Sequence, residues 1–111
     1  MPTTIYKIFR AEEWHAAQRD GVFRGSPDDI RDGFIHFSSA EQTPGTFEKY
    51  FAGQGGLVLA AIYADALGPA LKWEASRGGT LFPHLYGDLP LMVVRWSRAV
   101  SSSADLRQLG Q

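Results

Sequence analysis

Seven consecutive apolar residues, Leu57–Tyr63 (LVLAAIY), constrain the fold of this 111-residue chain more than any other feature of its sequence. The run has neither the alternation of a half-exposed strand nor the length expected of a buried helix. It therefore predicts a strand that is buried on both faces and lies at the centre of a sheet. We expect a chain of this length to form one domain that buries roughly 60 to 70 % of its unfolded surface.

Shorter patterns in the first third of the chain predict two more strands and two helices. Residues 4–9 and 33–38 are rich in β-branched and aromatic side chains, which is typical of strands. Residues 11–19 carry acidic side chains in the first turn and apolar ones on one side, which predicts a short amphipathic helix. Ser26 as N-cap and Pro27 at the first helical position mark the start of a second helix of one or two turns.

The remaining elements follow from capping and turn signals. Residues 39–42 form a capping box, so we expect a helix that runs toward Phe51, breaks or restarts at Thr43, and turns Phe47, Tyr50 and Phe51 inward. The rest of the chain predicts a short strand at 71–74, an ordered loop or edge strand at 82–87, a last strand at 92–100 and a polar surface tail at 101–111.

The order of these elements indicates the fold class. Helices come early and strands late, which favours an α+β fold over a parallel wound sheet. We therefore expect one domain over residues 1–100, with a curved, largely antiparallel split sheet and short helices, followed by the polar tail at 101–111.

Composition excludes several classes of protein. Eleven basic and twelve acidic residues leave a net charge of −1, so no general basic field exists to hold duplex DNA or an anionic membrane, and the net charge gives no support for RNA contact. Cysteine is absent, which excludes disulfide scaffolds and thiol nucleophiles. No apolar run approaches the roughly 18 residues of a membrane span, and we expect the protein to be cytoplasmic.

Polar residues inside apolar strands are the first candidates for a functional site. His36 interrupts an apolar strand, and Ser38 projects from the same face two residues later. Burying an imidazole costs free energy unless it is hydrogen-bonded, so His36 either faces a cleft or is satisfied by a backbone carbonyl. Lys7 lies on the same face of the first strand as Ile5 and Phe9, which we expect to point inward. We expect it to contact an anionic ligand, to pair with Glu74 or another carboxylate, or to lie on the solvent face.

The second half of the chain adds a further group of candidates. Trp73 places an aromatic plane beside the carboxylate of Glu74. A salt bridge at the rim of the domain would also explain Glu74. His84 lies in an ordered Pro-His-Leu-Tyr-Gly segment, which is typical of a site, although a packed corner of His84 and Tyr86 would look the same. We expect His36 and His84 to open onto one cleft.

These segments resemble a known family. Residues 32–38 with Gln42 downstream, and then residues 71–74 and 82–87, resemble the small bacterial family known as domain of unknown function 952. Members of that family are similar in fold to ADP-ribosyltransferases. The first strand and the strand that carries His36 look like those of tRNA 2′-phosphotransferases, which use NAD. In those enzymes a first-strand histidine helps to hold the dinucleotide, and the matching position here is Lys7.

The resemblance implies a protein of the ADP-ribosyltransferase group that acts on NAD or a nucleotide-like ligand. In such a site Trp73 or Tyr86 would stack on a ring, His36 and Ser38 would hydrogen-bond a ribose, and Glu74 would stabilise an oxocarbenium-like centre. The arginines that grip the RNA phosphate in those enzymes have no secure counterpart, although Arg24, Arg31 and Arg77 are available. The expected catalytic residues are His36, Glu74 and His84; the expected binding residues are Lys7, Ser38, Gln42, Trp73, Arg77 and Tyr86.

Two other functions compete with this one. His36 with Ser38 and His84 with Tyr86 form two His-apolar-hydroxyl triplets, similar to those of two-histidine phosphoesterases. The same cleft could instead serve a non-catalytic module that binds a small molecule or an anion, with Lys7 as the anion contact. We expect no metal, because the candidate ligands have no local metal-binding spacing.

Overall fold

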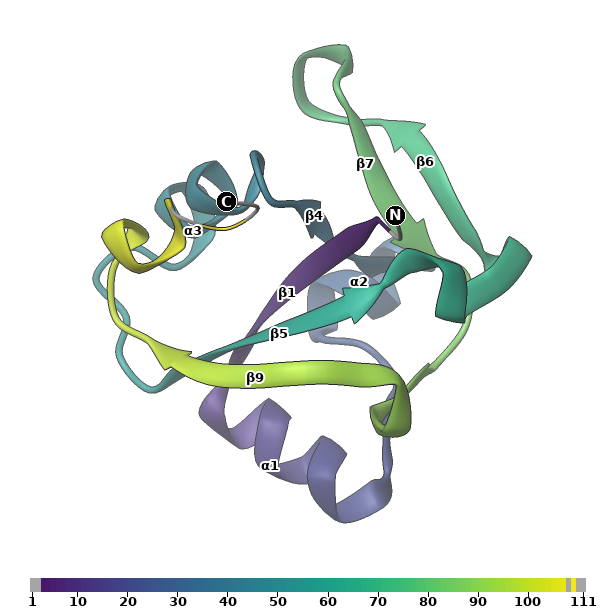
Figure 1. Ribbon diagram of the computed structural model, residues 1–111, viewed down its shortest axis with the longest axis horizontal. Helices are drawn as coiled ribbons and strands as arrows, with labels where there is room; N and C mark the ends of the chain where they lie inside the picture. The colour runs from purple at the N-terminus through teal and green to yellow at the C-terminus, as the bar shows by residue number, and fades with distance from the viewer. Residues whose placement is uncertain (1–2, 108, 110–111) are drawn as a thin grey trace.

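The largest sheet has four antiparallel strands. The computed structural model describes residues 3–107 and 109, apart from the side chain of Arg77. The strand order is β4 (Ser38–Ser39), β1 (Thr4–Arg10), β5 (Leu57–Tyr63) and β9 (Val94–Val100). β5 therefore lies between two long partners, and Figure 1 shows it running between β1 and β9. The prediction that this apolar run forms a central strand is confirmed.

A second sheet carries the histidine segments. Its order is β3 (Ile35–His36), β7 (Leu81–Leu85) and β6 (Leu71–Ala75), again antiparallel. A small pair joins β2 (Val22–Phe23) to β8 (Leu89–Pro90). The expected α+β class, with antiparallel sheets and short helices, is confirmed.

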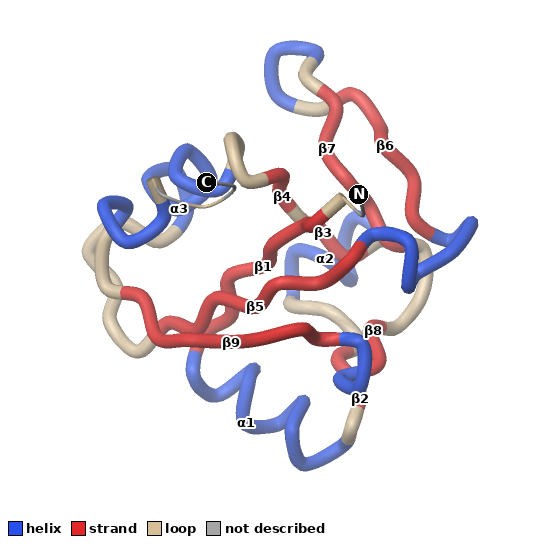
Figure 2. The backbone as a smooth tube through the Cα atoms, viewed as in Figure 1, coloured by secondary structure: helices blue, strands red, loops and turns tan. Residues whose placement is uncertain are grey.

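The described residues form three α-helices. They are α1 (Ala11–Asp20), α2 (Pro27–Asp32) and α3 (Thr43–Tyr50), and the short 3-10 helices are η1 (Ala64–Ala70), η2 (Arg77–Gly79), η3 (Leu91–Val93) and η4 (Ser103–Leu106). Trp14 of α1 packs into the core on one face of the sheet and Phe47 of α3 into the core on the other, as the placement of the helices in Figure 2 illustrates. α3 begins at Thr43, as expected, while the capping-box hydrogen bonds between Ser39 and Gln42 form in the turn before it.

Four details differ from the sequence-based expectations. Residues 33–38 are not one strand, because the chain crosses between sheets at Phe37, whose amide donates to the carbonyl of Pro83. β7 is the middle strand of its sheet and not an edge. The chain after residue 100 is not only a surface tail, since the side chain of Leu106 is 1 % exposed and completes the core beneath α3. Tyr50 is 46 % exposed instead of packed inward.

Candidate functional site

A cavity of about 250 Å³ opens where the short strand β4 leaves the side of β1 uncovered. Helices α2 and α3 and the strand β7 enclose it. Its polar lining includes Lys7, Asp29, His36, Ser38, Thr46 and His84. Four of the nine candidate residues named from the sequence therefore line one cavity.

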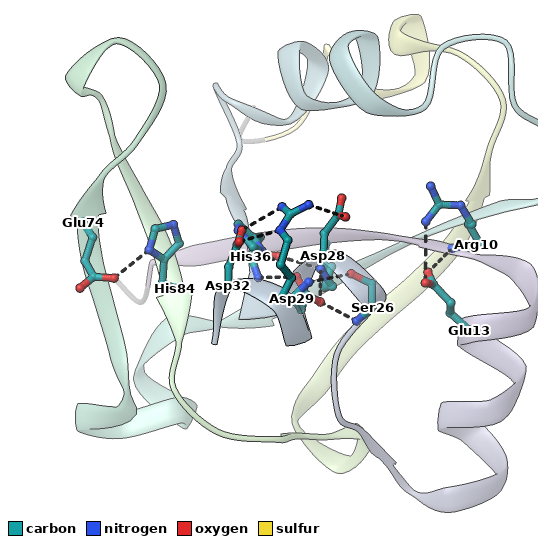
Figure 3. Close-up of polar contacts among 11 residues, drawn as sticks. Arg10, Glu13, Ser26, Asp28, Asp29, Asp32, His36, Glu74 and His84 are labelled. Atoms are coloured by element: carbon teal, nitrogen blue, oxygen red, sulfur yellow. Dashed lines mark hydrogen bonds and ion pairs between the residues drawn. The ribbon is translucent and has the colours of Figure 1, made fainter. Parts of the chain in front are cut away.

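His36 is held by two carboxylates. Its Nδ1 lies 2.7 Å from Oδ1 of Asp29, and its Nε2 lies 3.0 Å from Oδ2 of Asp32 (Figure 3). A carboxylate can only accept hydrogen bonds, so both contacts are favourable only for the imidazolium form, which donates from both nitrogens. Both nitrogens of His36 are thus occupied inside the protein.

Asp29 is the centre of this cluster. Its side chain is 3 % exposed and accepts hydrogen bonds from the backbone amides of Ser26 and His36. Burial alone would raise the pKa of Asp29, but the hydrogen bond from His36 and the charge of Lys7 outweigh burial and hold that pKa well below its ordinary value. The local reason is the capping box of α2, in which the hydroxyl of Ser26 accepts from the backbone amide of Asp29 and the carboxylate of Asp29 accepts from the backbone amide of Ser26.

Lys7 pairs with a carboxylate, which is one of the three alternatives expected from the sequence. Its Nζ lies 3.3 Å from Oδ2 of Asp29 and donates to the carbonyl oxygen of His36 at 2.9 Å. The side chain is 9 % exposed and its charge lies near the rings of Phe9, Phe23 and Phe37. Burial lowers the pKa of Lys7, although the charge of Asp29 opposes that shift.

His84 lies directly opposite His36 in the pairing of β3 with β7. The two rings are 5.5 Å apart between centroids, and the Phe34 ring stacks on His84 at 4.0 Å. Nδ1 of His84 lies 2.8 Å from Oε1 of Glu74, and the hydroxyl of Tyr86 donates to the same oxygen at 2.7 Å. The hydrogen bonds from Tyr86 and His84 lower the pKa of Glu74, and in return Glu74 raises the pKa of Tyr86. The structure thus brings both histidines to the same cavity, as expected.

The other sequence candidates separate into two groups. Ser38 lines the cavity, and its hydroxyl lies 2.9 Å from that of Thr46 on α3. Gln42 binds the backbone amide of Ser39 and the carbonyl of Leu81, and does not line the cavity. The side chain of Arg77 lies outside the described part of the structure.

Three expectations of direct ligand contact are not supported by this geometry. Trp73, Glu74 and Tyr86 are not part of the cavity lining. Trp73 is 40 % exposed on β6, the edge strand of the smaller sheet. Among the described residues, Glu74 contacts the cavity lining through His84.

Sequence reasoning missed the two aspartates that hold His36. A signal was present, since Asp29 occupies the third helical position after an N-cap serine and Asp32 lies four residues before His36. Thr46 and Tyr50 were also missed as lining residues, because they reach the cavity from α3 and nothing local shows which side of that helix faces it.

Fold and cavity together define a small antiparallel α+β domain in which two of the three histidines and three aspartates line one pocket. The chain matches the family model described as "Protein of unknown function (DUF952)" over residues 8–97 and belongs to that family. No curated protein matches it.

Two experimental structures of one bacterial protein are similar to this chain. The crystal structure of protein CC0527 from Caulobacter crescentus has a TM-score of 0.88 and 50 % sequence identity, covering 94 % of this chain and 91 % of that one. Its solution NMR structure has a TM-score of 0.82 and 50 % identity, covering 96 % and 93 %. Among residues 3–107 and 109, no helix is long and apolar enough to cross a membrane. Nor does any group of three or more His, Asp or Glu side chains in that part of the chain have the arrangement of a metal site.

Proposed function

We propose that the cavity binds a nucleotide or another small molecule that carries a ribose, and that the chain is an ADP-ribosyltransferase-like protein for which NAD is a candidate ligand. One observation carries the proposal: Lys7 of β1 lines the same cavity as His36 and Ser38. The resemblance to tRNA 2′-phosphotransferases assigns dinucleotide contacts to these two segments.

The walls of the cavity suit a ring and a sugar. Phe37, Tyr50 and Phe82 supply aromatic surface on which a base can stack. Ser38 and Thr46 supply hydroxyl groups that can exchange hydrogen bonds with a ribose. At about 250 Å³ the cavity lies below the roughly 300–1,000 Å³ that is typical of drug-sized ligands. It therefore accommodates one nucleoside part of a dinucleotide, with the remainder outside.

The charges of the cavity support recognition by hydrogen bonds more than recognition by net charge. Lys7 is paired with Asp29, and Arg31 is paired with Asp28 and Asp32. A simple anion would have to compete with these carboxylates, so an anion-binding module is the less favoured alternative. Glu74 has no direct access to the cavity, and we therefore propose binding by this site without a transfer step at that residue.

The two-histidine phosphoesterase is also less favoured. That mechanism needs two imidazoles that exchange protons with the substrate. Both nitrogens of His36 contact carboxylates, so His36 would have to break an ion pair before it could act.

Calorimetry and thermal shift test the proposed function. The purified chain is titrated with NAD, ADP-ribose and AMP, and with inorganic phosphate and nicotinamide as parts that lack a nucleoside. We expect the ribose-containing ligands to bind, and a ligand at 100 times its dissociation constant adds about 2.7 kcal/mol to the free energy of unfolding.

A matched pair of variants places the binding in the cavity. Thr46→Phe fills the cavity from α3, whereas Glu48→Phe adds the same ring on the exposed side of the same helix. Binding should be lost in the first and kept in the second. Absence of binding by all three nucleotides, or equal binding by phosphate alone, would refute the proposal.

A further inference from the structure

We propose that Nε2 of His84 is the proton-accepting atom of the cavity, in a ring whose tautomer Glu74 fixes at Nδ1, and that this nitrogen is open to a hydroxyl group of a bound molecule or to water. The two histidines face the same space but have different neighbours, and those neighbours decide which nitrogen is available.

Glu74 fixes the tautomer of His84. The carboxylate can only accept, so the 2.8 Å contact places a proton on Nδ1 of His84. In a neutral imidazole the other nitrogen, Nε2, is then an acceptor. Tyr86 donates to the same carboxylate oxygen, so Glu74 itself is held in position by a second residue. Figure 3 shows the Nδ1 edge of the ring turned toward Glu74 and the opposite edge turned away from it.

The ring of His84 is also held in place by packing. Its side chain is 5 % exposed, and the Phe34 ring stacks on it with an interplanar angle of 23°. The described residues include no hydrogen-bond partner for Nε2 of His84. Every fully buried side-chain nitrogen among them has a partner, so Nε2 is not fully buried. Since His84 lines the cavity, the free edge of the ring is the part that reaches it.

His36 cannot play this part. Both of its nitrogens contact carboxylates, so it offers no acceptor to the cavity. The difference lies in the number of carboxylate contacts, which is two for His36 and one for His84. His84 therefore keeps one ring nitrogen that can accept a proton from the cavity, and His36 keeps none.

The proton transfer itself is simple. The O–H bond of the hydroxyl breaks, its electron pair stays on oxygen, and the proton forms a new N–H bond at Nε2. The positive charge of the resulting imidazolium is balanced by Glu74 across Nδ1, so Glu74 is a positioning residue. The inference deepens the proposed function, because a ribose supplies such hydroxyls, but its test needs no nucleotide.

Long-range 1H–15N NMR spectra of the full-length labelled chain test the tautomer. The chain has three histidines, so single substitutions assign all the signals. We expect Nδ1 of His84 to be protonated and Nε2 to be bare, and His36 to be protonated on both nitrogens. Glu74→Ala should release the tautomer, while Tyr86→Phe, which keeps the Glu74–His84 contact, should not. A proton found on Nε2 of His84 in the unaltered chain overturns the proposal.

Acylation by diethyl pyrocarbonate, which modifies unprotonated imidazole nitrogens, tests access to that atom. Peptide mass spectrometry should find modification of His84 and of the exposed His15, and little at His36. Thr46→Phe should protect His84 from acylation and leave His15 reactive. If that variant does not fold, Ser76→Trp, which adds a ring at another lining position of the cavity, takes its place. An unreactive His84 beside a reactive His15 overturns the proposal, whether or not nucleotides bind. Failure of nucleotide binding with a reactive His84 counts only against the proposed function.

Discussion

Removal of the Asp29 carboxylate is the sharpest test of how the cavity is held together. Asp29 accepts hydrogen bonds from the amides of Ser26 and His36 and from the ring of His36, and it pairs with Lys7. Asp29→Ala leaves the Lys7 charge buried without a partner, and breaking a buried pair in this way costs about 3–5 kcal/mol. Because small domains are stable by about 5–15 kcal/mol, this is a large fraction of the total.

Lys7→Met is the matched variant. It removes the buried charge, and Asp29 keeps three of its hydrogen bonds, so we expect a smaller loss than for Asp29→Ala. In the double variant no charge is left unpaired between the two positions. The double variant should therefore be more stable than the sum of the single losses predicts, by about 0.5–3 kcal/mol, the usual range for residues in contact.

Urea unfolding at pH 7, followed by tryptophan fluorescence, measures all four proteins of this cycle. A loss below about 1 kcal/mol for Asp29→Ala would show that the carboxylate is not needed to hold a buried charge. Strict additivity in the double variant would show that Lys7 and Asp29 do not depend on each other, and either result would refute the reasoning.

Three further predictions concern other parts of the structure. The lowered pKa of Asp29 means that its contribution to stability is fully present above about pH 3.9, the unfolded value, and is lost as the pH falls toward the folded value. Urea titrations between pH 2.5 and 5 should therefore show a shallower loss of stability for Asp29→Asn than for the unaltered chain, and parallel curves would contradict this. Leu106→Ala should cost about 2–5 kcal/mol in the same assay, because the side chain is 1 % exposed; a surface tail would give almost no change. Trp73→Ala should lower the free energy of unfolding by only about 1 kcal/mol and leave the ligand affinity measured by calorimetry unchanged, since the ring is 40 % exposed and outside the cavity. A loss of affinity would show that Trp73 contacts the ligand.

The central strand and the early helices could be predicted from the sequence because their signals are local. An unbroken apolar run identifies β5, and serine, proline and aspartate in the right order identify the start of α2. The tail could not be predicted in this way. Residues 101–106 are mostly small and polar, and Leu106 is buried through contacts that are not local in sequence.

The candidate site was predictable only in part, for a similar reason. His36, Ser38 and His84 are polar residues within apolar strands, and that contrast is visible without a structure. Which side of β6 faces the cavity depends on how the smaller sheet is placed beside the larger one, so the sequence could not show that Trp73 and Glu74 lie outside the cavity lining. The role of Asp29 as partner of Lys7 depends on the approach of α2 to β1, which no spacing in the sequence encodes.

The contrast between the two histidines leads to a final prediction, on what each contributes. His36 binds Asp29, whose side chain is only 3 % exposed, so water cannot replace the hydrogen bond that the imidazole donates. Hydrogen bonds to charged groups contribute about 1.5–3 kcal/mol. His84 binds Glu74, whose side chain is 37 % exposed and can turn to water when the imidazole is removed. We therefore expect His36→Gln to lower the urea midpoint more than His84→Gln does. Conversely, His84→Gln should replace the basic nitrogen of the cavity by an amide, which does not take up a proton, and should weaken the binding of ribose-containing ligands while the fold remains intact. The opposite order, a His84→Gln variant that unfolds more easily than His36→Gln, would mean that the stack of Phe34 on His84, and not the carboxylate cluster, stabilises this part of the domain.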